Sequence, residues 1–280
     1  MDHSTLEIFK IVAQEQSVTR AAKRLGRAQS NITTRIQQLE EELSVELFVR
    51  GNKKMVLSAA GERFLDYTLR ILSLAEEAKQ ALHPTQPAGS LRMGAMEAAA
   101  ASRLTSILPC FHQQCPAVAL TLQTMPTQQL VERVLSAALD CALVSLPLNA
   151  SGQPECPEAL EYLPIFAEEL MLISPAGREE FRLAAFAQGC SYRKRAESFL
   201  SAMKNVEIQE IGSYHAVIAC IASGGYAGIV PQSVLALMTL PEGCDSQPVG
   251  TAITQLIWRQ GYVSPALDAM RQQLLLAADS

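Results

Sequence analysis

A row of polar side chains occupies one side of a predicted helix that begins near residue 29. With 100° of rotation per residue, Arg27, Ser30 and Thr34 point in similar directions. Hydroxyl, amide and guanidinium groups in such a row can hydrogen bond to base edges and phosphates in a DNA major groove. The row therefore predicts a DNA-contacting surface. Its members and flanking neighbours are Arg27, Gln29, Ser30, Asn31, Thr33, Thr34, Arg35 and Gln37.

Two short helices are expected to hold this surface. The apolar residues of the second helix recur at spacings of four, three and four, and therefore project away from the polar row. They are Ile32, Ile36, Leu39 and Leu43. The helix before it has Ser17 as its predicted N-cap, and small Ala21 and Ala22 allow a close helix contact. Gly26 stands where the connecting turn needs a residue without a Cβ, so the pair predicts a helix-turn-helix.

The charge of this region supports the same interpretation. Between Gln16 and Leu39 the chain has five basic residues, Arg20 among them, and no acidic residue. The whole chain has 23 basic and 28 acidic residues, so the basic charge is local, as phosphate contact requires. The alternative is an ordinary helical pair whose polar face is merely solvated.

Elements on both sides of the pair complete the predicted domain. Ser4 and Glu7 form a possible capping box for a first helix that runs to about Glu15. After the pair, Gly51-Asn52 lies between two short apolar runs, which indicates a hairpin. Its basic tip would reach flanking phosphates or a minor groove, as a wing does. The basic residues at this tip are Arg50, Lys53 and Lys54.

These features together resemble the N-terminal domain of LysR-type transcriptional regulators. The turn at 27–30 departs from the family, because many members start the recognition helix with a Ser-Gln-Pro-type sequence. The resemblance is carried by Leu6, Phe9, Ser17, Ala21-Ala22, Leu25, Ser30, Gln38-Leu39-Glu40-x-x-Leu43, Leu47-Phe48-x-Arg50 and Leu57-Ser-Ala-Ala-Gly61. It implies a winged helix-turn-helix over residues 1–58.

Residues 59–82 form a long predicted helix with a wide apolar face. Ser58 is its expected cap, and apolar residues recur at spacings of four and three. Such a face has no intrachain partner in the sequence pattern, so we expect it to pair with its twin in a dimer or tetramer, as the family's linker helix does. The alternative is a helix that covers its own C-terminal domain. Residues 83–89, rich in Pro and Gly, predict a hinge.

Residues 90–280 alternate strands and helices, which predicts an α/β domain in a chain that is α+β overall. The first half has expected strands at 91–96, 118–124 and 141–146, with helices at 98–114 and 128–138. The second half has expected strands at 162–166, 169–174, 206–211, 226–230 and 254–259, with helices at 193–203, 213–222 and from 265. This resembles the two-lobed effector domain of the same family, which is similar to type 2 periplasmic binding proteins. Lobe I would span about 90–161 and 265–280, and lobe II about 162–264.

A small molecule would bind where parallel strands end and the next helices begin. That rule selects residues of both lobes. The predicted effector-binding residues are Glu97, Ala98, Thr127, Ser145, Ser191, Tyr192, Arg193, Ser213 and Tyr214. The 189–193 stretch is associated with effector contact in the family. Packing is the alternative role for Tyr192 and Tyr214, and a surface ion pair is the alternative for Arg193.

Glu97 stands where many family members have Ser or Thr. A carboxylate there would repel an acid and attract an amine, so we expect an effector with an amino group, such as an amino acid or polyamine. The alternative is that Glu97 only complements the helix dipole and points to solvent. Closure of the cleft around this effector would change the spacing of the paired reading heads on DNA.

Composition excludes several other classes. Apolar residues make up 49% of the chain, so a sizeable core is expected rather than disorder. No apolar run is long enough to cross a bilayer and no secretion signal is present, which predicts a cytoplasmic location. The seven cysteines have irregular spacing, so neither a metal nor another cofactor is expected. No catalytic motif is found, and we expect no enzyme. A regulator switched by cysteine oxidation, a solute-binding protein and an enzyme of this fold are the alternatives.

Overall fold

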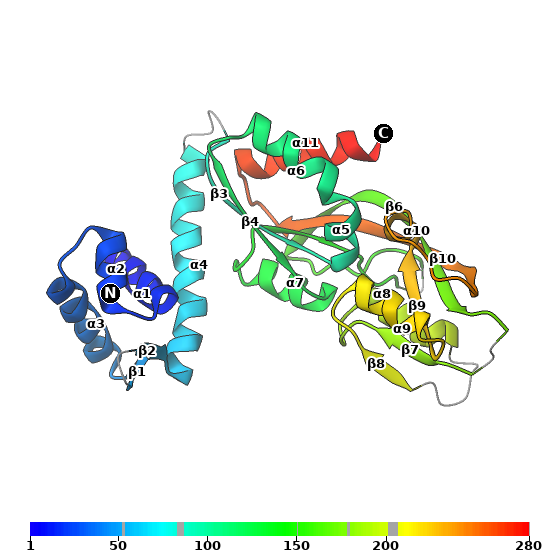
Figure 1. Cartoon of the computed structure of the whole chain (residues 1–280). Coiled ribbons are helices and arrows are strands. Elements are labelled where there is room, and N and C mark those ends of the chain that lie inside the picture. The colour runs from blue at the N-terminus through cyan, green and yellow to red at the C-terminus, as the bar shows by residue number, and fades with distance from the viewer. Residues whose placement is uncertain (52–53, 83–86, 150, 178–179, 201–206, 280) are drawn as a thin grey trace. The chain divides into compact units, whose positions relative to one another are not determined.

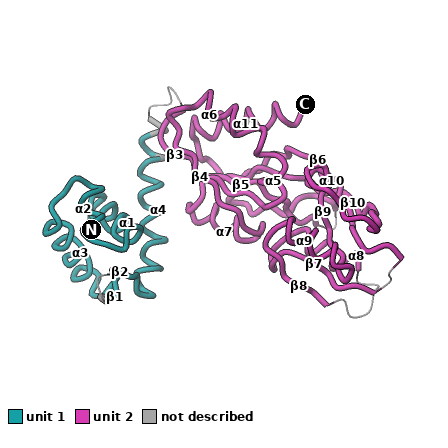
Figure 2. Tube along the Cα trace, in the orientation of Figure 1, with its two compact units in different colours: residues 1–83 teal, residues 84–280 magenta. Residues whose placement is uncertain are grey.

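The chain folds into two compact units, residues 1–83 and 84–280 (Figure 2). The computed structural model describes residues 1–51, 54–82, 87–149, 151–177, 180–200 and 207–279. Each unit has its own buried core. The predicted bounds of the reading head, the linker helix, the hinge and the lobes stay predictions. Lobe I and lobe II here name the two groups of parallel strands of the second unit with their helices.

Three helices form the core of the first unit (Figure 1). They are α1 (His3–Glu15), α2 (Val18–Leu25) and α3 (Gln29–Leu43). The Ser17 hydroxyl caps α2 and Gly26 ends it in the left-handed conformation, which confirms both predictions. The predicted Ser4 cap is wrong, because α1 begins earlier and the Asp2 carboxylate accepts a 2.7 Å hydrogen bond from the amide of Thr5.

The predicted hairpin is present as antiparallel β1 (Phe48–Gly51) and β2 (Lys54–Leu57). The Glu40 carboxylate of α3 accepts hydrogen bonds from the amides of Leu47 and Phe48, at 2.8 and 3.1 Å, and so joins the hairpin to the polar helix. Lys53 and the turn residue beside it lie outside the described residues. The side chain of Arg50 also lies outside what the structure describes.

The long helix α4 (Ala59–Leu82) starts against this hairpin. The Ser58 hydroxyl accepts a 3.0 Å hydrogen bond from the amide of Gly61, as a cap does. Gly61 is required here, because a Cβ would stand 2.0 Å from the carbonyl oxygen of Leu47. On the side of α4 that α1 does not cover, the large apolar residues that stay exposed are Tyr67, Ile71 and Leu74.

Among the described residues, eight strands form the sheet of the second unit, in the order β4-β3-β5-β10-β6-β9-β7-β8. In lobe I, β3 lies between β4 and β5 and is parallel to both. The single helix predicted at 98–114 is divided at Arg103 into two helices. The elements of lobe I are β3 (Gly89–Ala95), α5 (Glu97–Ser102), α6 (Leu104–Gln114), β4 (Val118–Thr124), α7 (Thr127–Leu135), β5 (Cys141–Val144) and α11 (Pro265–Ala278).

Lobe II repeats the arrangement, with β7 between β8 and β9 and parallel to both. The strand β7 was not predicted, because it follows a charged segment and has only four residues. The elements of lobe II are β7 (Arg182–Ala185), α8 (Ser191–Phe199), β8 (Ile208–Glu210), α9 (Tyr214–Ala222), β9 (Tyr226–Pro231) and the short α10 (Gln232–Leu235).

Two long antiparallel strands, β6 (Leu160–Pro175) and β10 (Cys244–Arg259), connect the lobes. The two separate strands predicted at 162–166 and 169–174 are therefore one, and the strand predicted at 254–259 is only the second half of β10. Pro164 and a register shift near Thr254 interrupt the alternation of side chains, which explains the shorter predictions.

Candidate functional site

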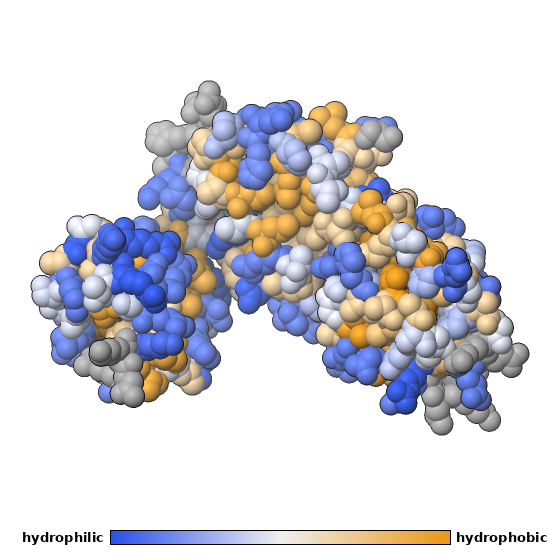
Figure 3. Space-filling model, viewed as in Figure 1, coloured by the Kyte–Doolittle hydropathy of each residue, from blue (hydrophilic) through white to orange (hydrophobic). Residues whose placement is uncertain are grey.

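The polar side of α3 is exposed and its apolar side is buried. Ile32, Ile36 and Leu39 are at most 2% exposed and belong to the core of the first unit. The residues exposed on the other side are Gln29, Ser30, Asn31, Thr34 and Gln37. The face of this unit visible in Figure 3 is mostly hydrophilic. A helix with one solvated hydrogen-bonding face can enter a major groove.

Some predicted DNA-contacting residues have partners within the protein. The guanidinium of Arg20 contacts the backbone carbonyl and the carboxylate of Glu15. Arg35 lies 3.7 Å from a carboxylate oxygen of Asp2. The Thr33 hydroxyl donates to the carbonyl oxygen of Gln29 at 3.1 Å. The two ion pairs are exposed, so they add little to stability.

Other groups on this face remain available. Arg27 and Lys54 are exposed and form no ion pair within the described ranges. The residue that precedes α3, Ala28, has no side-chain hydrogen bond to cap the helix. The first amides of α3 therefore lack a side-chain acceptor, and their partial positive charge suits a phosphate oxygen.

The second unit contains a cavity of about 190 Å³. It lies at the carboxyl ends of two pairs of parallel strands, β3 with β4 and β7 with β8, and therefore takes walls from both lobes. Its lining residues are Met96, Glu97, Ala98, Thr124, Met125, Pro126, Thr127, Phe186, Ala187, Cys190, Ser191, Tyr192, Ile211, Gly212 and Tyr214. Glu97 is the one charged residue among these described lining residues.

Six of the nine predicted effector-binding residues line this cavity: Glu97, Ala98, Thr127, Ser191, Tyr192 and Tyr214. The other three lie outside it. Ser145 is fully buried, and the Ser213 hydroxyl caps α9 by accepting a hydrogen bond from the amide of Ala216. Arg193 forms ion pairs at 2.8 Å with Glu197 and 2.6 Å with Glu210, as the ion-pair alternative expected.

The two tyrosines are part of the wall. Tyr214 is 2% exposed, and its ring meets that of Phe186 edge-on at 4.9 Å. Burial is the largest cause that raises the pKa of Tyr214, and the nearby charges of Glu97 and Glu168 act in the same direction. Burial also raises the pKa of Tyr192, so both phenols stay neutral and can donate hydrogen bonds.

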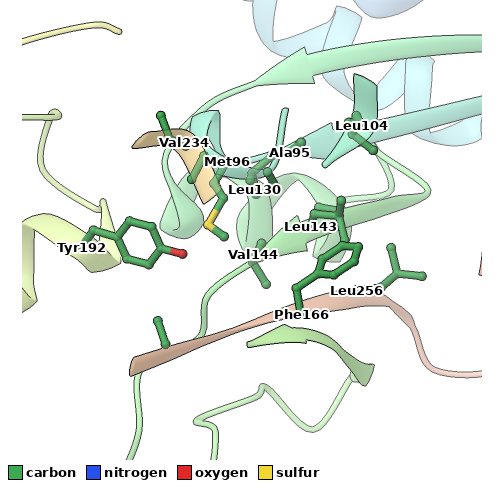
Figure 4. Packing of buried hydrophobic residues seen from close by; sticks show 14 of the residues in the cluster. Ala95, Met96, Leu104, Leu130, Leu143, Val144, Phe166, Tyr192, Val234 and Leu256 are labelled. Atoms are coloured by element: carbon green, nitrogen blue, oxygen red, sulfur yellow. The ribbon is translucent and has the colours of Figure 1, made fainter. Parts of the chain in front are cut away.

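Three buried hydroxyls of the second unit lack a hydrogen-bond partner in the described structure. Those of Tyr192, Thr254 and Ser145 make no geometrically acceptable hydrogen bond in the described structure, although Thr254 lies close enough to Tyr192 to oppose the rise of its pKa. Figure 4 shows the Tyr192 ring extending from α8 toward Met96 and Val144 of lobe I. A buried hydroxyl without a partner costs stability.

A larger groove, of about 1110 Å³, adjoins the cavity. The two share Thr127, Cys190 and Ser191, so the groove is an outer chamber of the same interlobe cleft. It has both signs of charge, including Glu155 and Lys194.

One contact joins the lobes near the cavity, and a second joins lobe I to the connecting strand β6. The backbone N–H of Gln128 in lobe I donates a 3.3 Å hydrogen bond to the backbone carbonyl oxygen of Gly189 in lobe II. Gly189 has φ +87°, and a Cβ there would stand 3.1 Å from that of Gln128, so glycine permits this close approach. The Arg103 guanidinium lies 2.8 Å from the buried Glu168 carboxylate of β6 and stacks over Phe166.

Within the described ranges, no cluster of His, Cys, Asp or Glu is placed to hold a metal ion. None of the described helices is both long enough and apolar enough to span a membrane.

Comparison with known families identifies both units. Residues 3–62 match the profile of a bacterial regulatory helix-turn-helix protein of the lysR family, and residues 84–278 match the LysR substrate binding domain. The chain belongs to the LysR family. This LysR-family protein is a DNA-binding transcriptional regulator with an effector-binding domain, not an enzyme, which confirms the predicted family and fold class.

Relatives of this regulator cover most of its length. It is 34% identical over 281 residues to the uncharacterized HTH-type transcriptional regulator YusT of Bacillus subtilis (strain 168), covering 95% of this chain and 93% of that protein. It is 36% identical to the HTH-type transcriptional regulator SoxR of Arthrobacter sp. (strain TE1826), covering 85% of this chain and 82% of that protein.

Solved structures share the fold. A full-length OxyR variant from Pseudomonas aeruginosa superposes with a TM-score of 0.72 at 20% identity, covering 100% of this chain and 97% of that one. CbnR, a LysR-family transcriptional regulator, superposes with a TM-score of 0.66 at 23% identity over 100% of both chains. At these identities the likeness shows the fold alone.

Sequence reasoning missed part of the regulator's cavity. Phe186 and Ala187 were absent from the predicted effector residues because they follow the unpredicted β7. The apolar run just before Phe186 was the available signal. Met125 and Pro126 lie one or two residues beyond β4, where the strand-end rule applied but was used only for Thr127.

Proposed function

We propose that a small molecule bound in the 190 Å³ cavity controls how this regulator binds its operator. The observation that carries the proposal is that both lobes contribute walls to one cavity. A ligand there touches α5 and α7 from lobe I and α8 from lobe II, so it can favour one arrangement of the lobes over another. Such a bias is what couples an effector to DNA binding.

We propose that α3 enters the major groove with its exposed polar side. Ser30, Thr34 and Gln37 would read base edges, while Arg27, Lys54 and the uncapped start of α3 would contact phosphates. Arg20 and Arg35 would contact phosphates while they keep their intrachain partners. Arg50 and Lys53 stay predicted phosphate contacts of the wing.

We propose that the effector has an amino group. Glu97 forms no ion pair with a described residue, and no basic side chain lines the cavity. A plain carboxylate or phosphate would therefore meet an uncompensated negative charge, whereas an amine would meet a partner. The dipole-complement role of Glu97 is compatible with this assignment, because one carboxylate can serve both.

We propose that the regulator acts as a dimer or tetramer in the cytoplasm, where its DNA target is. The exposed apolar residues of α4 recur at spacings of four and three, as a paired helix requires. Two reading heads would then contact a symmetric operator.

The redox-switched alternative has weaker support. Cys190 lines the cavity, but burial raises the pKa of its thiol, although the amides of Arg193 and Tyr192 oppose that shift. A raised thiol pKa leaves less of the reactive thiolate. Burial also raises the pKa of Cys115, Cys141 and Cys156.

A mobility-shift experiment on DNA upstream of the protein's own gene tests the proposal. We expect putrescine or an amino acid to change the affinity or the mobility of the complex, and simple dicarboxylates to have no effect. Thr34→Ala should change the difference in binding free energy between operator variants by about 1–3 kcal/mol. Lys54→Ala should weaken binding to all sequences alike. Equal behaviour of the two variants, or a response to dicarboxylates only, would contradict the proposal.

A further inference from the structure

We infer that Arg103 and Arg195 are positioning residues that set the angle between the two lobes on either side of the cavity. Each arginine contacts the strands that connect the lobes, and each lies on or directly after a helix whose first residue lines the cavity. The inference rests on the proposed control by a bound small molecule, and it adds the residues through which the lobes would respond.

The connecting strands β6 and β10 have a short segment that no strand of either lobe pairs with. Strand β5 of lobe I pairs with β10 at 255–258, and β9 of lobe II pairs with β6 at 170–173. Among the described residues, positions 166–169 of β6 and 251–254 of β10 pair only with each other, and a register shift lies near each end of this segment. Two strands without neighbours twist and bend more easily than a sheet. We call this segment the hinge ribbon.

Arg103 contacts the hinge ribbon from lobe I. It directly follows α5, and its Nε lies 2.8 Å from a carboxylate oxygen of Glu168, whose side chain is 3% exposed. The Arg103 guanidinium also stacks over Phe166, 4.8 Å from the centre of the ring. Helix α5 begins at Glu97 in the cavity wall, so this six-residue helix has the cavity at one end and the ribbon at the other.

Arg195 contacts the hinge ribbon from lobe II. Its Nη1 donates a 2.7 Å hydrogen bond to the backbone carbonyl oxygen of Thr251 on β10. Thr251 pairs with Glu169, the neighbour of Glu168, so the two arginines reach adjacent positions of the ribbon from different lobes. Arg195 belongs to α8, which begins at Ser191 in the cavity wall.

These contacts fix each lobe to the ribbon at one place. A rotation of lobe I that separates Arg103 from Glu168 is costly, because it leaves a buried carboxylate without its cation. A hydrogen bond between the lobes supports this anchor, since the Ser233 hydroxyl of α10 donates to the Ser102 hydroxyl at the end of α5 at 3.1 Å. A ligand that displaces the start of α5 or α8 therefore moves the arginine attached to that helix, and with it the preferred lobe angle.

Distances between the lobes test the inference without any effector. Spin labels attached through an unnatural amino acid at Gln113 of α6 and Ala219 of α9, both exposed, report the lobe angle in the full-length protein by pulsed electron paramagnetic resonance. Dilution with excess unlabelled protein removes distances between chains from the signal. We expect Arg103→Gln and Arg195→Gln each to shift the main distance, or to widen its distribution, by about 2 Å or more, as hinge motions do.

Matched controls remove an arginine from an ion pair within one lobe. Arg92→Gln breaks a pair with the buried Asp140 inside lobe I. Arg182→Gln breaks a 2.9 Å pair with Glu207 inside lobe II. Both controls should leave the distance distribution unchanged, whatever they do to the melting temperature.

A double variant keeps the test open if Arg103→Gln alone does not fold. Arg103→Gln combined with Glu168→Gln leaves no unpaired buried charge, and we expect the same change in distance. Unchanged distances in the folded variants of both arginines, or equal changes in the controls, overturn the inference, and a change in one variant only overturns the role of the other arginine. Because no effector is used, such results do not touch the proposed cavity ligand. If the distances change as expected but no tested amine alters operator binding, the proposed amine effector is overturned instead.

Discussion

The polar side of α3 and the cavity of the second unit both present hydrogen-bonding groups, but they hold them differently. Ser30 and Thr34 stand in solvent on a helix whose opposite side is packed. Tyr192 and Tyr214 belong to the core and touch the cavity with only part of their surface. Substitutions on α3 can therefore alter DNA preference at little cost in stability, whereas substitutions around the cavity alter ligand binding and stability together.

Salt should separate the two sites most strongly. If a pair of reading heads contacts 6–10 phosphates, DNA affinity should fall by on the order of 10³–10⁵ between 50 and 200 mM salt, because bound counterions are released. Binding of a small ligand in the cavity should change by less than about threefold over the same range, because it involves far fewer charges. Fluorescence anisotropy of labelled DNA and calorimetry of the ligand measure the two quantities. A DNA affinity that does not change with salt concentration would contradict the phosphate contacts proposed for Arg27 and Lys54.

The next largest difference is expected in stability. Tyr214→Ala should lower the free energy of unfolding by about 3–5 kcal/mol, because it empties a fully buried site that packs on Phe186. Thr34→Ala should change it by less than about 0.5 kcal/mol. Urea denaturation followed by far-UV circular dichroism compares both variants with the natural protein. A large loss in Thr34→Ala would mean that the polar side of α3 is packed rather than solvated.

The smallest effect concerns Cys190 in the cavity wall. Its thiol pKa is raised by burial, so at about pH 8.5 it should react with iodoacetamide several-fold more slowly than the exposed Cys110. A raised pKa also means that its contribution to stability is complete below the ordinary thiol pKa and is lost as the pH rises toward the folded value. Peptide mass spectrometry after timed alkylation gives the rates. Faster alkylation of Cys190 than of Cys110 would favour the redox alternative.

Local patterns sufficed for much of the first unit. The Ser17 cap, the Gly26 helix end and the Ser58 cap depend on residues within a few positions of each other, so local sequence predicts them. The Ser4 cap was also predicted from local sequence, but it was wrong. Asp2 can cap the same helix, and the two caps differ little in energy.

Contacts between distant segments decided what the patterns left open. Glu40 binds the amides of a hairpin seven and eight residues away, and Glu168 meets Arg103 across 65 residues. The strand β7 has too few residues to show a period of its own, and becomes a strand because β8 and β9 pair with it. No local signal indicates such partners.

The sequence by itself determined that this chain belongs to the LysR family of DNA-binding regulators, with an α/β domain after its helix-turn-helix. Periodicity, charge and turn residues are properties of neighbouring positions, so they can be recognised in the sequence without the structure. Only the tertiary structure decided which strand ends share one cavity, that Arg193 is held by Glu197 and Glu210, and that the hydroxyl of Tyr192 is buried without a partner. These facts depend on which distant segments pack against one another and exclude water. The positions of those segments along the chain do not specify which of them will pack together.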